Sequence, residues 1–428
     1  MIGLVLVVLA PSAPAAPGEL DGTFGVGGVL TTNFGGTYDW AYAGARQPDD
    51  RILAAGVSNA HGTYDFALAR YTTDRSLDPS FGEGGMVTTD FGESYDWGYA
   101  LALQPDRKIV VGGVSDRGGS KNLALARYLP DGTLDDSFGD GGMVTDGRRP
   151  LTTDIVRALA LQPDGKILVA GVTFEDKASL DPQGDFIVAR YSADGSPDPT
   201  FGVGGVATTD FGDGSYDDAY ALLRQPDGRI VLGGYSTSAG GPGVLFGADQ
   251  LALARYTPGG LPDVGFGRQG KVLVDAGSLD EEIRALALTP GGALVASGFA
   301  NGERGGDALV ARFTPEGEVD ESFGDGGWTI SNLSPYSEGL AAVALQPDGR
   351  IVAAGNVARA KEALADFAVV RYDPDGRLDT SFGSGGVATA DFSGRLDRVS
   401  ALILQPDGKL VTVGWSEHDF AMARFNGS

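Results

Sequence analysis

Carboxylates and aromatic rings are the groups in this sequence whose types and spacing suit ligand chemistry. An acid recurs at one offset in seven similar segments: Asp39, Asp96, Asp154, Asp217, Glu281, Glu338 and Asp397. Carboxylate oxygens are hard donors that suit calcium and attract cationic ligands. Recurrence in every copy equally suits a structural role, in which each carboxylate accepts backbone N–H groups of its own loop. Calcium is therefore the candidate cofactor, and no metal ligands are assigned.

Aromatic residues flank some of these acids and break the sevenfold regularity. Only the first two copies have Trp after the acid, and a third copy places Tyr before it. Exposed aromatics beside a carboxylate can stack on sugar rings or hold a peptide, whereas the alternative is packing between structural elements. The candidate ligand-binding residues are Tyr38, Asp39, Trp40, Tyr95, Asp96, Trp97, Tyr216, Asp217 and Asp218.

The sequence lacks the residues that several other kinds of chemistry require. The sequence has no Cys, which excludes disulfides, thiolate nucleophiles and zinc ribbons. Its two histidines, His61 and His418, have no Ser-centred elbow nearby for a catalytic triad. A formal net charge of -25 would repel nucleic acid. We assign no catalytic residues; the enzymatic alternative is glycoside cleavage by a pair of carboxylates.

The chain repeats itself seven times. A segment close to Leu-Asp-x-Ser-Phe-Gly recurs at intervals of 57 to 65 residues, followed by a Gln-Pro-Asp-Gly turn and an Ala-Arg-Tyr segment. The Phe of this segment is Phe24, Phe81, Phe138, Phe201, Phe266, Phe323 and Phe382. Periods of this length are typical of stacked or radial architectures.

Each copy contains four short runs with strand-like alternation, separated by turn residues. In the first copy these runs are residues 28–34, 41–47, 51–58 and 65–71. The pattern predicts an all-β, seven-bladed β-propeller of four-stranded antiparallel blades, in which the first and last copies pair to close the ring. An open solenoid is the competing arrangement, but it would need polar terminal copies.

These motifs resemble the delta-60 repeat family of bacterial proteins. The resemblance covers residues 20 to about 425 and is clearest in Leu378-Asp379-Thr380-Ser381-Phe382-Gly383 and Gln405-Pro406-Asp407-Gly408. The fifth copy departs most, with Thr289-Pro290-Gly291-Gly292 at the turn. The resemblance implies a secreted or surface-exposed propeller and assigns no reaction.

Spacing between landmarks separates scaffold from variable surface. The distance from the Gly of the third run to the Arg of the fourth varies between 10 and 21 residues, whereas the other distances are nearly constant. Variable connections usually form the working surface of a repeat protein. The recurring Arg and the Asp of Leu-Asp lie toward the opposite face, where we expect seven structural ion pairs.

The N-terminal residues 1–17 look like an export signal, because a short apolar run precedes a Pro/Ala-rich stretch. Residues 18–428 then form a single seven-repeat propeller domain. We expect a monomer that is secreted or held in the cell envelope and has no transmembrane segment or nucleic-acid partner.

The predicted function is that of an exported, non-catalytic binding or scaffold module. Its ligand would be a carbohydrate, peptide or protein on the face that carries the variable connections. The alternative is a secreted hydrolase or lyase that uses carboxylates facing the central channel.

Overall fold

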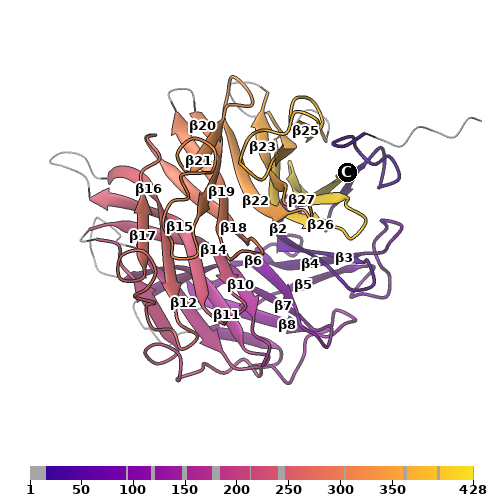
Figure 1. The fold of residues 1–428 in the computed structure, drawn as a ribbon. Helices are drawn as coiled ribbons and strands as arrows, with labels where there is room; N and C mark the ends of the chain where they lie inside the picture. The colour runs from indigo at the N-terminus through magenta and orange to yellow at the C-terminus, as the bar shows by residue number, and fades with distance from the viewer. Residues whose placement is uncertain are drawn as a thin grey trace, which may run out of the picture.

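The protein is a ring of seven four-stranded antiparallel sheets (Figure 1). The computed structural model describes residues 16–92, 95–116, 121–146, 152–175, 184–212, 214–239, 246–302, 305–359, 364–392 and 396–427. The prediction of an all-β, seven-bladed propeller is confirmed. Within the described ranges no helix is long and apolar enough to cross a membrane.

The blades are numbered along the chain, each from its first strand to its last. Blades 1 to 3 are β2 (Asp39–Arg46), β3 (Ile52–Ser58), β4 (Asp65–Tyr71), β5 (Met86–Thr89); β6 (Asp96–Leu103), β7 (Ile109–Ser115), β8 (Asn122–Tyr128), β9 (Met143–Asp146); and β10 (Thr152–Leu161), β11 (Ile167–Glu175), β12 (Gly184–Tyr191), β13 (Val206–Thr209). Blades 4 and 5 are β14 (Tyr216–Arg224), β15 (Ile230–Ala239), β16 (Phe246–Tyr256), β17 (Lys271–Val274); and β18 (Glu281–Leu288), β19 (Leu294–Gly302), β20 (Gly305–Phe313), β21 (Trp328–Ser331). Blades 6 and 7 are β22 (Glu338–Leu345), β23 (Ile351–Ala358), β24 (Ala365–Tyr372), β25 (Val387–Ala390); and β26 (Asp397–Leu404), β27 (Leu410–Ser416), β28 (Asp419–Phe425), β1 (Val29–Thr32).

The ring closes because strand β1 completes the last blade. β1 pairs antiparallel with β28, with Val29 opposite Ala423 and Thr32 opposite Phe420. The N-terminal and C-terminal parts of the chain therefore lie side by side (Figure 1). The first strand of every sequence copy likewise forms the outermost strand of the blade before it. This closure, which the sequence predicted, gives every blade four strands and leaves only short outer edges.

The first strand of each blade lies nearest the axis and contains a bulge. The inner strands β2, β6, β10, β14, β18, β22 and β26 contact one another around the ring. Each has a register shift after its third, fourth or fifth residue. The next strand has a glycine opposite the shift. A Cβ on Gly56, for example, would lie 1.8 Å from the carbonyl oxygen of Trp40. Glycine is required there because any side chain would collide with the bulged strand.

Apolar residues from neighbouring blades interlock between the sheets. Leu53 and Phe66 of blade 1 pack with Ile109 and Tyr128 of blade 2 around Phe81, which is fully buried. Phe81 belongs to the recurring Leu-Asp-x-Ser-Phe-Gly segment, and the other six Phe of that segment are equally buried. The core of the protein is therefore a set of seven clusters between blades.

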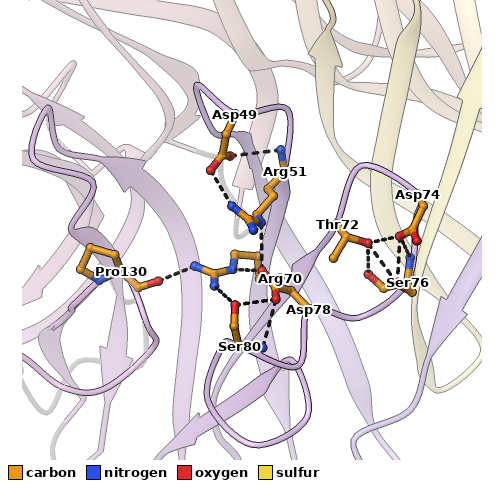
Figure 2. A network of polar contacts seen from close by, with 9 residues as sticks. All are labelled: Asp49, Arg51, Arg70, Thr72, Asp74, Ser76, Asp78, Ser80 and Pro130. Atoms are coloured by element: carbon orange, nitrogen blue, oxygen red, sulfur yellow. Dashed lines mark hydrogen bonds and ion pairs between the residues drawn. The ribbon is translucent and has the colours of Figure 1, made fainter.

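An arginine ties blade 1 to blade 2 (Figure 2), and five further blades repeat the contact. In blade 1, Arg70 Nε donates to Asp78 at 2.9 Å and Nη2 donates to Ser80 at 3.1 Å, while Nη1 donates to the carbonyl of Pro130 in blade 2. The guanidinium also lies 4.5 Å from the ring centre of Phe81. Burial acts to raise the pKa of Asp78, but hydrogen bonds from Ser80 and the charge of Arg70 hold it below its usual range.

The predicted Arg–Asp pair forms in all seven blades. The pairs are Arg70–Asp78, Arg127–Asp135, Arg190–Asp198, Arg255–Asp263, Arg312–Asp320, Arg371–Asp379 and Arg424–Asp21. Since every blade repeats the contact, these pairs belong to the scaffold.

Replacing one arginine of this set should destabilise the ring. We expect Arg127→Met to lower the free energy of unfolding by about 3 kcal/mol, because Asp135 and the carbonyl of Ala193 lose a buried donor. Urea denaturation at pH 7 measures the change. The control is Arg377→Met, whose side chain is 77% exposed and should change stability by less than about 0.5 kcal/mol. Equal effects of the two variants would remove the arginine from the scaffold.

Candidate functional site

The bulges of the inner strands project one side chain each into the central channel. These bulged residues are Tyr42, Tyr99, Arg157, Tyr220, Arg284, Ala341 and Ser400. All seven line a cavity of about 850 Å³, together with Trp415, Arg398 and residues of blades 5 and 6. The size is that of a small-molecule or oligosaccharide site. Bulges re-aim side chains next to functional sites in many sheets.

Four of the predicted aromatics gather on one side of this channel. Trp40 and Trp97 lie with ring centres 6.0 Å apart, and Trp40 stacks on Trp415 at 5.0 Å. Tyr64 connects the two predicted groups, because its ring lies 6.0 Å from Tyr38 and 5.2 Å from Tyr95. The Tyr95 side is the most open, with 56% of that residue exposed. Blades 7, 1 and 2 thus share a continuous aromatic surface.

The third predicted group, Tyr216-Asp217-Asp218, joins this surface through an arginine. Asp218 accepts from Arg157 Nη2 at 3.1 Å. The same guanidinium lies 5.3 Å from the ring centre of Tyr99 and 5.0 Å from that of Tyr220. Tyr216 itself stacks on Tyr235 at 5.9 Å. The channel wall is therefore a belt of side chains from blade 1 to blade 4, in which the Arg157 guanidinium lies between the rings of Tyr99 and Tyr220.

The belt continues to Arg284 on β18. Its guanidinium lies 4.0 Å from the ring centre of Tyr220 and 5.5 Å from that of Phe299, and it forms an ion pair with Glu282. Burial raises the pKa of Glu282 to about 7, although the Arg284 charge opposes the rise. Glu282 therefore gains and loses its proton near neutral pH.

The recurring acids hold the connections that lead into the inner strands. Asp39, Asp96 and Asp217 are fully buried, and each accepts the N–H of a Phe five or six residues earlier, at 2.7, 2.7 and 2.8 Å. Burial raises the pKa of Asp39 and brings that of Asp217 to about 6. The geometry matches the structural role that the sequence left open, and it fixes the aromatic residues beside each acid.

Three groups of acids bring carboxylate oxygens within 4.8 Å of one another between blades. They are Asp65, Asp90 and Asp96; Asp185, Asp210 and Asp217; and Asp366, Asp391 and Asp397. In the third group Arg359 forms ion pairs with Asp366 and Asp391, so a side chain already supplies the positive charge. Each group contains one of the seven recurring acids from which calcium binding was predicted, and that prediction stays a prediction.

The sequence did not indicate the bulged residues or Trp415 as site residues. Trp415 both stacks on Trp40 and lines the cavity. The available signal was the residue three positions after each recurring acid, which is Tyr, Arg, Ala or Ser in different copies, although the residue that follows it is Ala in every copy. A residue that differs between copies at a fixed distance from a repeated residue marks such a position.

The chain is similar in sequence to a β-propeller family. The family model described as "Domain of unknown function (DUF5122) beta-propeller" matches residues 47–81, 104–138, 162–201, 225–266, 346–382 and 405–428. Six of the seven repeats are thus matched, and the exception follows Thr289 in the divergent fifth copy. No curated protein matches the chain in sequence.

Solved structures share the fold at low identity. A polysaccharide lyase of family PL25, an ulvan lyase, is 12% identical with a TM-score of 0.52, covering 93% of this chain and 96% of its own. Sqt1 from Chaetomium thermophilum, bound to the N-terminus of ribosomal protein L10, is 13% identical with a TM-score of 0.46, covering 92% and 98%. Drosophila semaphorin 1b, domains 1–2, is 10% identical with a TM-score of 0.46, covering 93% and 86%. At these identities the likeness concerns the fold alone.

The buried acids should make stability depend on pH in a defined direction. Burial raises the pKa of Asp217 in the folded protein from its ordinary value of 3.8 to about 6. The folded state therefore holds this proton more tightly, and the associated stability is lost as pH rises through 6. Relative to Asp217→Asn, the natural protein should lose about 2 kcal/mol of unfolding free energy between pH 4 and pH 7.5. Urea denaturation at both pH values measures this difference. Asp407→Asn, in an exposed turn, is the control and should follow the natural protein; parallel curves for Asp217→Asn would contradict the assignment.

Proposed function

We propose that the protein is a non-catalytic binding module whose ligand, a carbohydrate, peptide or protein, lies on the face at which the inner strands begin. The observation that carries this proposal is the continuous aromatic surface beside the 850 Å³ cavity. Partly exposed Tyr and Trp offer large, rigid contact area and are enriched in binding sites. The ligand would contact Tyr38, Trp40, Tyr95, Trp97 and Tyr216.

The acids of the predicted site act in this proposal by positioning those rings. Asp39 and Asp96 each precede a Trp at the start of an inner strand, and their hydrogen bonds to Phe34 and Phe91 hold the connection in place. Asp217 does the same for Phe211, and Asp218 orients Arg157. A rigid frame lowers the entropy lost when a ligand binds.

The face of the aromatic surface is also the face of variable connections. Ser58 lies opposite both Asp39 and Asp65 in the sheet of blade 1, so the connection from β3 to β4 emerges beside the start of β2. The corresponding connections differ in length between blades. Variation confined to one face supports ligand contact there.

We also propose that the chain is exported, acts outside the cytoplasm as a monomer and carries repeats of the delta-60 type. Most of the signal-like segment, residues 1–15, lies outside the described residues. Residue 17 already joins the ring, since its carbonyl accepts the N–H of Gly383. This contact supports a folded domain that begins near residue 18.

The enzymatic alternative rests on Glu282. Its pKa of about 7 and its place beside the channel suit a general acid for glycoside cleavage. Against a catalytic role, its carboxylate is engaged by Arg284.

Loss of one aromatic residue should weaken ligand binding without unfolding the protein. We expect Trp97→Ala and Tyr95→Ala to raise the Kd for a ligand found by screening neutral and acidic oligosaccharides and peptides by at least tenfold, because exposed rings dominate such contacts. Isothermal titration calorimetry measures Kd, and thermal unfolding checks the fold. Trp328→Ala, on the outermost strand of blade 5, is the control and should leave Kd unchanged. Unchanged Kd in both aromatic variants would move these residues into the scaffold.

A reducing-end assay tests the alternative. The binding proposal predicts that incubation with polysaccharides at pH 6–8 releases no new reducing ends above a heat-denatured sample. Release that disappears in Glu282→Gln, while the variant still folds, would establish the hydrolase or lyase instead.

A further inference from the structure

Three arginines line the cavity, and their pairing differs. Arg157 is paired with Asp218 at 3.1 Å, and Arg284 is paired with Glu282. Arg398 follows the buried Asp397 on β26 and is solvent-accessible from the cavity. Within the described part of the chain, Arg398 has no carboxylate at ion-pair distance. An arginine that enters a cavity without a partner offers five unsatisfied donors to a ligand.

The charges around Arg398 favour binding of an anionic ligand. Partial burial in the cavity and the nearby Arg284 guanidinium both lower the pKa of Arg398. Glu338 is an acid that also lines the cavity. Burial and the charge of Asp307 raise the pKa of its carboxyl, and hydrogen bonds from Ser334 and Leu333 of its own connection oppose the rise. Among the described residues, this protein of formal charge -25 therefore has a guanidinium in its channel without a carboxylate partner. Because Arg398 is exposed to solvent, an anionic ligand can reach its guanidinium and form charge-assisted hydrogen bonds with it.

The open volume lies beside Arg398 because blades 6 and 7 have small residues at the bulge. Ala341 and Ser400 occupy the positions that Tyr42, Tyr99 and Tyr220 fill in other blades. Trp415, which stacks on Trp40, and Tyr42 border the same cavity. Arg398 and Trp415 lie opposite each other on adjacent strands, so a guanidinium and an aromatic ring border the space together.

We propose that this cavity binds an acidic saccharide, with a carboxylate or sulfate group paired to Arg398 and a sugar ring against Trp415 and Tyr42. The inference rests on the proposed binding function and names its ligand class. Arg holds carboxylate and sulfate oxygens in a planar, two-pronged geometry, and aromatic faces stack on the C–H faces of sugar rings. A sugar whose acid is attached directly to the ring satisfies both contacts at once. An acidic peptide would place its carboxylate on a flexible side chain, away from any ring.

The test compares a galacturonic acid tetramer with its methyl ester, which has the same rings without the charges. Isothermal titration calorimetry on the full chain should show binding of the acid form at least tenfold tighter than that of the ester. Arg398→Gln should remove that preference, and raising the salt concentration should weaken binding of the acid form only. Arg377→Gln, at an exposed site outside the cavity, is the matched control and should bind like the natural protein.

A second variant makes the test independent of Arg398. Ala341→Phe fills the cavity and should abolish binding of the acid and the ester alike. Thermal unfolding of each variant, expected within a few degrees of the natural protein, confirms that the fold is intact.

Each other outcome overturns the inference in a distinct way. Equal affinity for acid and ester, or full affinity in Arg398→Gln, would reject the acidic ligand and leave the binding function in place. Tighter binding of tetraglutamate than of the saccharide, dependent on Arg398, would assign an acidic peptide. Absence of binding to acidic and neutral saccharides, sulfated tetrasaccharides and peptides would overturn the inference together with the proposed function.

Discussion

A glycine in the second strand of each blade lets the carbonyl of the inner strand approach, and the channel lining follows from that approach. A Cβ at Gly56, Gly113 or Gly298 would lie 1.7–1.8 Å from a carbonyl oxygen. Because the carbonyl occupies this space, the inner strand bulges and turns one extra side chain toward the axis. The same constraint operates in all seven blades, so the channel receives seven side chains at one level. Their identities are free to differ, since the bulge depends on the glycine and not on the residue it presents.

The outer parts of the ring are kept uniform by a second repeated contact. Each recurring arginine contacts an aspartate and a buried Phe ring. In six of the blades it also donates to a backbone carbonyl of the next blade. The contact uses groups that are identical from copy to copy, so it sets the angle between blades without reference to the ligand. Repeated residues thus build the frame, and the residues that break the repeat occupy the channel. The division explains why aromatic rings gather in blades 7, 1 and 2 while the cavity opens toward blades 6 and 7.

Charge is distributed to match this division. The recurring carboxylates are buried against backbone N–H groups, and the raised pKa of Asp39 and Asp397 records the cost of that burial. In the channel, Arg157 and Arg284 are compensated by Asp218 and Glu282. Arg398 has neither a repeated counterpart nor a carboxylate partner in the described residues. Of the three cavity arginines, Arg398 is thus the one without a carboxylate partner in the part of the chain that the structure describes.

Sequence alone determined the strands, the blade number, the ring closure and the seven Arg–Asp pairs, because each depends on contacts that recur at a constant spacing. It also indicated Trp40 and Trp97, where the repeat is broken beside a landmark. It did not place Trp415 against Trp40, or Arg157 between Tyr99 and Tyr220. The residues of each contact lie on different blades and far apart in the sequence. Only the closed ring brings seven inner strands to one axis. Ring closure and the bulges of the inner strands decide which side chains meet at the axis. A single repeat does not contain this information.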